Sequence, residues 1–416
     1  MPTSHSTHLI AALLATVLVN PALGQSNNNP HNPETKKKIS VPRLTAAKKA
    51  ALPVVLPGTM IFQTDSISGF YYYTGKAWLN LSKYQLSSSE MAITTSTRIP
   101  LPGASSVPNR VTTLAGQLNP GYLNGAKAWF HYPQGIAVGA NGLVYVADTY
   151  NHCVRIIGLD GEVSLLAGST KGYADGTGTT AFFHSPTGVA VDLEGTVYVA
   201  DAGNSRIRKI SPWGEVTTLA GKDQGFKDGV GEDAAFRTPC AIAVGSKGTL
   251  YVADAGNNRI CRIAPDGTVV TLAGTLSGLA YPTGIAVDKS DNVYVADTNN
   301  HRIQVISPDG TMSTLVGSTS GYVDGARSTA LFCRPSSLAV NDAGTVFVSE
   351  LGNNRVRVIS PTGEVSTVAG NGSASFADGM GPTASFTLPA GIALDATGTV
   401  YIADTGNNSI RKIVTP

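Results

Sequence analysis

From residue 110 onward, short apolar runs alternate with clusters of Gly, Pro, Asn and Asp. The most regular run reads Val-Tyr-Val-Ala-Asp and is followed by an Asn-containing turn and an Arg-Ile run. Its six copies end at the acidic residues Asp148, Asp201, Asp254, Asp297, Glu350 and Asp404. Successive acidic residues are 53, 53, 43, 53 and 54 positions apart. A nearly constant period of this length predicts a propeller or a solenoid.

Each copy contains four short runs rich in Val and Ile, bounded by turn residues. In the second copy these runs are 188–192, 197–201, 207–210 and 216–221. Such runs predict strands joined by hairpins, and hence four-stranded antiparallel sheets. Both faces of the strands are largely apolar, so each sheet must be covered on both sides. Sheets stacked radially around an axis meet that requirement.

The two ends of the repeat array complement each other. The last copy stops after its third run, Ile410–Ile413, while an unmatched fourth run, Val111–Gly116, precedes the first copy. A strand from the N-terminal end can therefore complete the last sheet, and closure hides edges that would otherwise recruit other chains. We predict an all-β, six-bladed β-propeller over residues 110–416, with four-stranded antiparallel blades and a last blade closed by an N-terminal strand.

These motifs resemble the NHL repeat family, whose Ala-Asp-x-x-Asn-x-Arg-Ile core is found at 200–207, 253–260 and 296–303. The resemblance covers about residues 110–416 and implies a six-bladed propeller, as the repeat count does. The family contains RNA-binding, protein-binding and sensor modules as well as a lyase that uses metal ions. Membership therefore implies the fold and leaves the function open. The resemblance is to a secreted bacterial type.

The first residues have the pattern of a secretory leader. Residues 9–19 are apolar but too few to span a bilayer, and Ala22-Leu23-Gly24 provides small residues at a cleavage site. We expect a signal peptide over 1–24, hence an extracellular or periplasmic location. No later segment is apolar enough to predict a membrane span.

Three further segments precede the repeats. Residues 25–52 are rich in Asn, Pro and Lys and predict a flexible linker. Residues 53–81 contain two aromatic runs around Ser66–Gly69 and predict a small aromatic β-hairpin, which is marginal alone and should dock or self-associate. Residues 82–109 form a Ser/Thr-rich connector. The oligomeric state is open at this stage.

Charge and cysteine content narrow the classes of partner. The formal net charge is +2, and only 14% of residues are charged, which argues against a nucleic-acid surface. The four cysteines, Cys153, Cys240, Cys261 and Cys333, lack metal-type spacing and fall at unlike positions of the repeat. We interpret them as unpaired, buried thiols.

The repeated carboxylates favour a structural role. Each ends a strand beside a turn, where an Asp accepts hydrogen bonds from turn amides, and recurrence in every blade exceeds what a ligand site needs. We therefore interpret Asp148, Asp201, Asp254, Asp297, Glu350 and Asp404 as turn caps. The arginines that open the next strand are expected to join neighbouring blades, and they are Arg206, Arg259, Arg302 and Arg355.

Inserted Asp-Gly loops recur before most blades and are interpreted as turns. Each offers only one or two oxygen ligands, fewer than a calcium site requires. We predict no catalytic residue, no metal ligand and no cofactor, with Ca or Zn kept as a lesser alternative.

Positions that do not repeat are better candidates for binding. The residues just before each innermost strand vary between blades and should surround one mouth of the central channel. The candidates are His131, Tyr132, His184, Arg237, Tyr281 and Arg334. Their alternative interpretation is solvated loop residues. His152 and His301 fall in other turns and are expected to be exposed.

Two functions remain open. The first is a non-enzymatic binding or sensor module whose partner is an extracellular protein or glycan. The second is a metal-dependent enzyme of the lactonase or amidating-lyase type. Only His131 and His184 could form a pair of ligands from adjacent blades, and no third histidine accompanies them. The sequence therefore favours binding.

Overall fold

The computed structural model describes residues 43–44, 46–50, 60–63, 69–73, 78–80 and 109–414. The chain divides into two units, Met1–Gly103 and Ala104–Pro416. The expected leader and, apart from Asn109, the expected connector lie outside the described residues, so both stay predictions. Among the described residues, no helix has the length and apolar character needed to cross a bilayer.

The first unit contains a small sheet and one short helix. Its elements are β1 (Arg43–Leu44), α2 (Ala46–Ala50), β2 (Met60–Gln63), β3 (Gly69–Tyr73) and β4 (Trp78–Asn80). The expected hairpin is confirmed, because β2 and β3 pair antiparallel with Phe62 opposite Phe70. β4 extends the hairpin on one side, and β1 pairs parallel with β2 on the other.

Two of these elements fall inside the range expected to be a flexible linker. β1 and α2 lie within residues 25–52, and α2 has the sequence Ala-Ala-Lys-Lys-Ala, which is rich in strong helix formers. The ammonium of Lys49 lies 3.6 Å from the centre of the Tyr71 ring, a cation–π contact between helix and sheet. The low apolar content that indicated a linker therefore conceals a short ordered segment.

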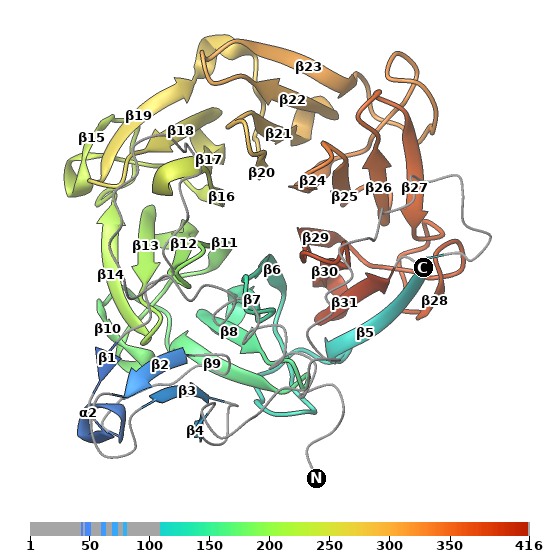
Figure 1. Ribbon diagram of the computed structural model, residues 1–416. Helices are drawn as coiled ribbons and strands as arrows, with labels where there is room; N and C mark the ends of the chain where they lie inside the picture. Colours follow the sequence, from blue (N-terminus) through green and yellow to red (C-terminus); the bar gives the residue numbers. More distant parts are fainter. Residues whose placement is uncertain are drawn as a thin grey trace, which may run out of the picture. The chain divides into compact units, whose positions relative to one another are not determined.

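The second unit is a ring of six blades (Figure 1). Blade 1 consists of β6 (Pro133–Val138), β7 (Val144–Asp148), β8 (Cys153–Ile157) and β9 (Val163–Gly168). Blade 2 consists of β11 (Pro186–Val191), β12 (Val197–Asp201), β13 (Arg206–Ile210) and β14 (Glu215–Ala220). Blade 3 consists of β16 (Pro239–Val244), β17 (Leu250–Asp254), β18 (Arg259–Ile263) and β19 (Thr268–Ala273).

The remaining blades repeat the same order. Blade 4 consists of β20 (Gly284–Val287), β21 (Val293–Asp297), β22 (Arg302–Ile306) and β23 (Met312–Gly317). Blade 5 consists of β24 (Pro335–Val340), β25 (Val346–Glu350), β26 (Arg355–Ile359) and β27 (Val365–Ala369). Blade 6 consists of β29 (Pro389–Leu394), β30 (Val400–Asp404), β31 (Ser409–Val414) and β5 (Arg110–Gly116).

Three blades gain a short fifth strand at their outer edge. The added strands are β10 (Gly176–Thr177), β15 (Gly229–Val230) and β28 (Gly379–Met380). Each comes from an Asp-Gly loop and pairs with the outermost strand of its blade. The loops interpreted as turns therefore also cover the exposed edges of these sheets.

The predicted seam is confirmed. β5 pairs antiparallel with β31, from Gly116 opposite Ser409 to Arg110 opposite Val414. β28 pairs with β5 on its other side, and the amide of Gly381 donates to the carbonyl of Asn109 at 2.6 Å. Figure 1 shows the two ends of the array meeting in this blade, β5 in cyan beside β31 in red.

Most of the apolar core lies between blades. One buried cluster joins Ile136 and Val146 of blade 1 to Ala403 and Ile410 of blade 6. Equivalent clusters join blades 2 and 3, 3 and 4, 4 and 5, and 5 and 6. Apolar surface on both faces of each sheet is thus covered by the neighbouring sheets, as the sequence pattern requires.

The innermost strands contact one another around the channel. A Cβ atom on Gly391 would lie 2.1 Å from the carbonyl oxygen of Gln134 in blade 1, and one on Gly284 would lie 2.4 Å from that of Ser336. Glycine at these positions permits the close approach of one blade's backbone to the next.

Candidate functional site

The six repeated carboxylates are buried. In blade 2, Asp201 accepts hydrogen bonds from the backbone amide of His184 (2.8 Å), the side-chain amide of Asn204 (2.8 Å) and the guanidinium of Arg208 (3.0 Å). None of the 3₁₀ turns that follow these residues receives a capping hydrogen bond from them. Each carboxylate fixes the loop that enters its blade 17 positions earlier and also binds the asparagine side chain of its own turn.

Each carboxylate has an arginine partner, which the sequence analysis placed incorrectly. In four blades it comes from the third position of the next strand, as Arg155, Arg208, Arg357 and Arg411. In blades 3 and 4 it comes from the first position, as Arg259 and Arg302, and Cys261 and Gln304 occupy the third. These pairs lie within blades, and do not join neighbouring ones.

The two other arginines at strand starts have different contacts. The guanidinium of Arg206 lies over the Tyr173 ring at 3.9 Å and donates to the carbonyl of Asn204. Arg355 lies over Tyr322 and donates to the carbonyls of Asn353 and Asn371. Neither joins adjacent blades, because each packs on the aromatic residue of an Asp-Gly loop in its own blade.

The aspartates of the Asp-Gly loops clamp the outermost strands. Asp175 accepts from Arg208 at 2.6 Å and from both the amide and the hydroxyl of Thr218 at 3.2 Å. Asp228, Asp324 and Asp378 make the same contacts in blades 3, 5 and 6. Their oxygens already accept protein hydrogen bonds, so these loops do not offer the open oxygen cluster that calcium requires.

The loops that lead into the blades share a strained backbone. Tyr132, Ser185, Thr238, Tyr281, Arg334 and Leu388 all have φ between 50° and 57°. In five of them the amide donates to a side chain of the preceding blade, as Tyr132 does to Asn408 and Ser185 does to Nδ1 of His152. The residues that vary around the mouth are therefore held by fixed contacts between blades.

His152 and His301 take part in these contacts. The sequence analysis expected both to be exposed, but both are half-buried. Nδ1 of His152 accepts from the amide of Ser185 at 3.1 Å, and Nδ1 of His301 accepts from the amide of Arg334 at 3.1 Å. A ring nitrogen accepts a hydrogen bond only when it carries no proton, so each of these bonds requires an unprotonated Nδ1.

Replacing His152 by asparagine is expected to reduce the loss of stability at acidic pH. Burial, together with His184 and Lys171, lowers the pKa of His152 below 6.5. The unfolded chain thus binds the proton more readily, so the stabilisation is full above about pH 6.5 and is lost as pH falls through the folded pKa. Asn258, Asn354 and Asn408 fill the equivalent position without titrating, and asparagine tolerates φ 54°.

The measurement is the thermal unfolding midpoint between pH 8 and pH 5. His152→Asn should show a shallower fall with acidification than the wild type. His152→Ala serves as the control, since it removes the acceptor and should lower the midpoint at every pH. An unchanged pH slope in His152→Asn would show that this contact does not titrate.

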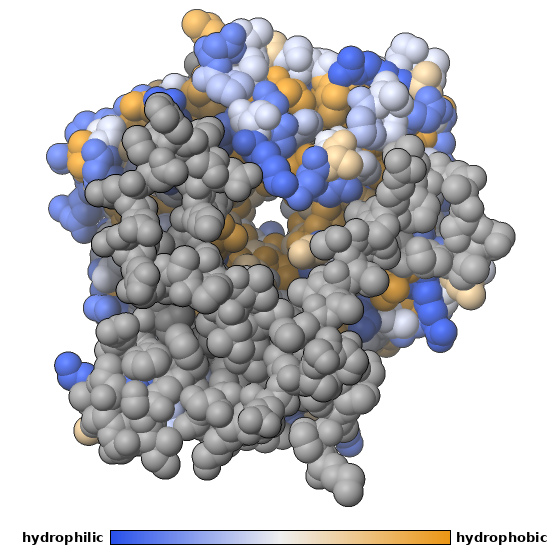
Figure 2. Space-filling model, viewed as in Figure 1, coloured by the Kyte–Doolittle hydropathy of each residue, from blue (hydrophilic) through white to orange (hydrophobic). Residues whose placement is uncertain are grey.

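A central channel with a cavity of about 530 Å³ runs between the innermost strands. Figure 2 shows its opening, with hydrophobic residues visible around it. A polar layer near one end contains Gln134, Thr187, Cys240, Thr283 and Ser336. Beyond it lies an aliphatic layer made by Ile136, Val189, Ile242, Ile285, Leu338 and Ile392. The cavity has the size of a small-molecule site.

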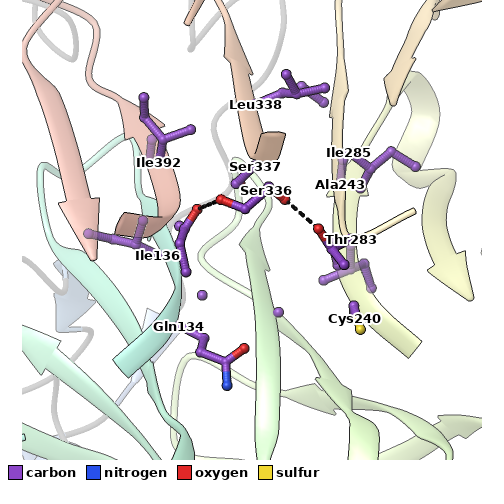
Figure 3. Close-up of a pocket in the computed structure, with 18 of the residues that line it drawn as sticks. Gln134, Ile136, Cys240, Ala243, Thr283, Ile285, Ser336, Ser337, Leu338 and Ile392 are labelled. Carbon is purple, nitrogen blue, oxygen red and sulfur yellow. Dashed lines mark hydrogen bonds between the residues drawn. The ribbon is translucent and has the colours of Figure 1, made fainter. Parts of the chain in front are cut away.

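The hydroxyl groups of the polar layer are already engaged. Thr283 donates to the carbonyl of Ser336 at 2.9 Å, and Ser336 donates to the carbonyl of Ala390 at 2.8 Å (Figure 3). Thr187 donates to the carbonyl of Pro239 at 3.2 Å. These bonds join neighbouring blades. These three hydroxyls are therefore not free donors for a ligand in the channel.

The channel walls offer no acid, base or nucleophile for chemistry. Among the described residues that line the cavity, no histidine, aspartate or glutamate is present, and Arg334 is the one charged side chain. Burial raises the pKa of the Cys240 thiol to about 12, so it stays protonated at neutral pH and is neither a nucleophile nor a metal ligand. All four cysteines are unpaired, as predicted, but only Cys153 and Cys261 are buried, while Cys240 and Cys333 are partly exposed.

The structure brings together only part of the predicted mouth set. Tyr281 and Arg334 line the channel. His131 and Tyr132 instead contact Tyr150, whose ring stacks on Tyr132 with centroids 5.0 Å apart. His184 lies edge-on to His152, with centroids 6.0 Å apart. Arg237 is exposed and is not among the lining residues.

His131 and His184 have different ring contacts. Each packs against a different aromatic partner. Within the described part of the chain, no group of three or more His, Cys, Asp or Glu side chains has an arrangement that could hold a metal ion.

Sequence reasoning missed Tyr150, although the repeat contains a signal for it. The matching turn positions in four other blades are Gly203, Gly256, Gly352 and Gly406, where a Cβ atom would meet the preceding loop within 2.8 Å. Blade 1 has Tyr150 there, and its side chain is 50% exposed. Blade 4 has Asn299 at this position, so the large, exposed aromatic ring of Tyr150 is the clearest departure from the repeated turn.

Comparison with known proteins agrees with this architecture. The family model for the NHL repeat matches residues 130–157, 183–210, 279–306, 332–359 and 386–413. The model for the phage tail like trimerisation region matches residues 25–97. The NHL matches fall in blades 1, 2, 4, 5 and 6, and blade 3 has the same strand order and the same carboxylate–arginine pair.

The chain is similar to parts of several known proteins. Protein SUPPRESSOR OF QUENCHING 1, chloroplastic, of Arabidopsis thaliana is 28% identical over 70% of this chain, which spans 26% of that protein. An auxiliary nutrient binding protein from Bacteroides ovatus has a TM-score of 0.59 at 20% identity, over 74% of this chain and 77% of its own. A gluconolactonase from Xanthomonas campestris has a TM-score of 0.51 at 17% identity, over 74% and 95%.

These solved structures share the propeller fold with the chain, and one fold thus supports both binding proteins and enzymes. The repeated motifs, the six blades and the matched segments all agree. The chain belongs to the NHL repeat family and folds as a six-bladed β-propeller.

Proposed function

We propose that the chain is an exported, non-enzymatic binding module that uses the face around the channel mouth to bind a protein or glycan at the extracellular surface. The observation that carries this proposal is where the non-repeating side chains lie on the propeller. Departures from the repeat, such as Tyr150, Tyr132, Tyr281 and Arg334, gather on the mouth face, while the channel walls lack catalytic groups.

The exposed ring of Tyr150 is a suitable contact for such a partner. Tyr132 supports it from one side at an interplanar angle of 12°, so the ring is held in a fixed orientation at little cost in conformational entropy. Aromatic residues held in this way commonly contribute most to binding, since they bury a large area on contact. The fixed backbone contacts of the loops provide the rigid support that a binding face needs.

The metal-dependent enzyme alternative receives no specific support from the site. A lactonase or lyase of that type needs a cluster of His and carboxylate ligands in the channel. The repeated carboxylates are instead paired with arginine, and His131 and His184 have different aromatic partners. Export rests on the leader pattern of residues 1–24 and is part of the proposal.

We propose further that residues 25–97 assemble the chain into a trimer that presents three propellers together. The match to the trimerisation region model and the small four-stranded sheet, in which β1 and β4 are edge strands, support this. Linking several copies of a weak binding face raises the overall affinity by orders of magnitude when geometry allows simultaneous contact. Light scattering should give the mass of three chains, and a monomer mass would contradict the trimer.

The binding proposal is tested on the purified mature chain with arrays of cell-surface glycans and extracellular proteins. A metal-free protein should capture an array member, and Tyr150→Ala should weaken that capture by about tenfold or more. Leu193→Ala is the matched control, because Leu193 is 71% exposed and lies at the other end of the innermost strand. A stoichiometric metal that is lost on mutating His131 and His184 together would overturn the proposal.

A further inference from the structure

The channel changes character along its length. Arg334 and Tyr281 stand at the mouth, the layer of Gln134, Thr187, Cys240, Thr283 and Ser336 follows, and the aliphatic layer lies beyond it. At the far end the lining residues are Val138, Val191, Val244, Val340 and Leu394. The wall is thus cationic and polar at one end and aliphatic over the rest.

The guanidinium of Arg334 has no carboxylate partner. The backbone amide of Arg334 is fixed by His301, but no hydrogen bond or ion pair to its side chain occurs among the described residues. This differs from Arg155, Arg208, Arg259, Arg302, Arg357 and Arg411, each of which pairs with an acidic residue. A single unpaired cation at the mouth of an otherwise uncharged channel favours one negative charge placed beside it.

The walls below the mouth offer aliphatic contacts to a ligand. The hydroxyls of Thr187, Thr283 and Ser336 donate to carbonyls of the next blade, so these three groups offer it no free donor. At the far end Val138, Val191, Val244, Val340 and Leu394 are partly exposed, and covering such side chains with an alkyl chain releases about 25 cal/mol for each Å² of apolar surface removed from water.

We propose that the channel binds a single-chain amphiphile with one carboxylate group, such as a long-chain fatty acid, with its head at Arg334 and its chain along the aliphatic walls. A single guanidinium matches the single charge of a carboxylate, and it pairs with one in a bidentate, charge-assisted manner. This inference rests on the proposed function in taking the channel region as a binding site, and it names a ligand class for it.

Calorimetric titration of the full-length chain with dodecanoate tests this inference. Wild-type protein should bind one dodecanoate per propeller, while dodecanol, which has the same chain without the charge, and butyrate, which has the charge without the chain, should bind more weakly. Arg334→Gln should reduce dodecanoate affinity by about tenfold or more, the effect of losing one charge-assisted contact. Arg237→Gln is the matched control, because that exposed arginine lies outside the cavity lining.

A second variant tests the walls. Ala243 lines the channel and is half-exposed, so Ala243→Phe should narrow the channel and weaken both dodecanoate and dodecanol. If that variant fails to fold, the dodecanoate affinities of Arg334→Gln and Arg237→Gln still test whether Arg334 binds the carboxylate. Equal dodecanoate affinity in those two variants, equal affinity for dodecanol and dodecanoate in the wild type, or no dodecanoate binding would overturn the inference.

The same titration separates this inference from the proposed function. Tyr150 does not line the channel, so Tyr150→Ala should leave dodecanoate affinity unchanged while it weakens capture on the mouth face. Loss of array binding with retained dodecanoate binding would leave the inference standing alone. Retained array binding without dodecanoate binding would contradict the amphiphile site and leave the proposed function standing.

Discussion

Replacing Val111 by aspartate is expected to prevent the propeller from folding cooperatively. Val111 is completely buried on β5, opposite Ile413 of β31, in a cluster that joins blades 5 and 6. A carboxylate there would find no cationic partner among the valine and isoleucine side chains of that cluster. An unpaired buried charge costs several kcal/mol, which is a large part of the 5–15 kcal/mol by which native proteins are stable.

The neighbouring residue provides the control for this variant. Arg110 lies in the same strand but is exposed, so Arg110→Asp should leave the unfolding midpoint within a degree or two. The measurement is calorimetry, supported by the yield of soluble protein. Deletion of residues 110–116 should act like Val111→Asp, because it leaves the edge of β31 unpaired. Equal unfolding midpoints for Val111→Asp and the wild type would show that β5 is dispensable to the ring.

Replacing Arg208 by methionine is expected to lower the free energy of unfolding by about 3–5 kcal/mol. The side chains of Arg208 and Asp201 are both completely buried, and their atoms approach to 3.0 Å. Burial raises the pKa of Asp201, against the opposing effects of Asn204, the amide of His184 and Arg208 itself. The effect of burial on the pKa of Asp201 is therefore already larger than the opposing effect of its hydrogen-bond partners. Removing one of these partners leaves an uncompensated buried carboxylate.

Two further variants separate the pair from general packing. Arg206→Met removes an arginine of the same strand that stacks on Tyr173 and has no acidic partner among the described residues, so it should cost about 1 kcal/mol or less. The double variant Arg208→Met with Asp201→Leu should recover part of the loss, since the remaining groups are apolar. Urea unfolding gives all of these values. A loss in Arg208→Met no larger than that in Arg206→Met would contradict a structural role for the pair.

The fold could be predicted because the sequence repeats it. Six copies of one apolar pattern, and a strand missing at one end and present at the other, are sufficient to determine the blade number and the seam at Val111–Gly116. Periodicity reports backbone arrangement well, because strand length, turn position and burial are local properties that recur in every blade. The hairpin at Met60–Tyr73 was accessible for the same reason.

Side-chain partners were harder to predict, since they depend on residues that the turns bring together. Asp201 and Arg208 are seven positions apart and meet because β12 and β13 pair, whereas Asp254 takes Arg259 from five positions away. The arginine partner stands at the third position of its strand in some blades and at the first in others, so it does not appear in the sequence as one repeated motif. The linker was misjudged around α2 because five residues of helix carry little apolar signal.

The candidate site was predicted only in outline. Variable positions precede each innermost strand, but Tyr281 and Arg334 line the channel whereas Tyr132 and Leu388, which have the same left-handed backbone, do not. The aliphatic channel wall could not be distinguished from core by sequence, because the same Val and Ile pattern serves both. Tyr150 was accessible through the glycines that it replaces.

The closed ring is the central claim, because the channel exists only if blade 6 meets blade 1 through β5. Thr112 and Lys412 face each other across that pairing, at a spacing that suits a disulfide. The double variant Thr112→Cys with Lys412→Cys should form this disulfide within one chain under mild oxidation, and peptide mapping by mass spectrometry should recover residues 112 and 412 in one cross-linked peptide of the monomer band. Failure to form that cross-link in folded protein, or its formation only between chains, would contradict a ring closed by its own N-terminal strand.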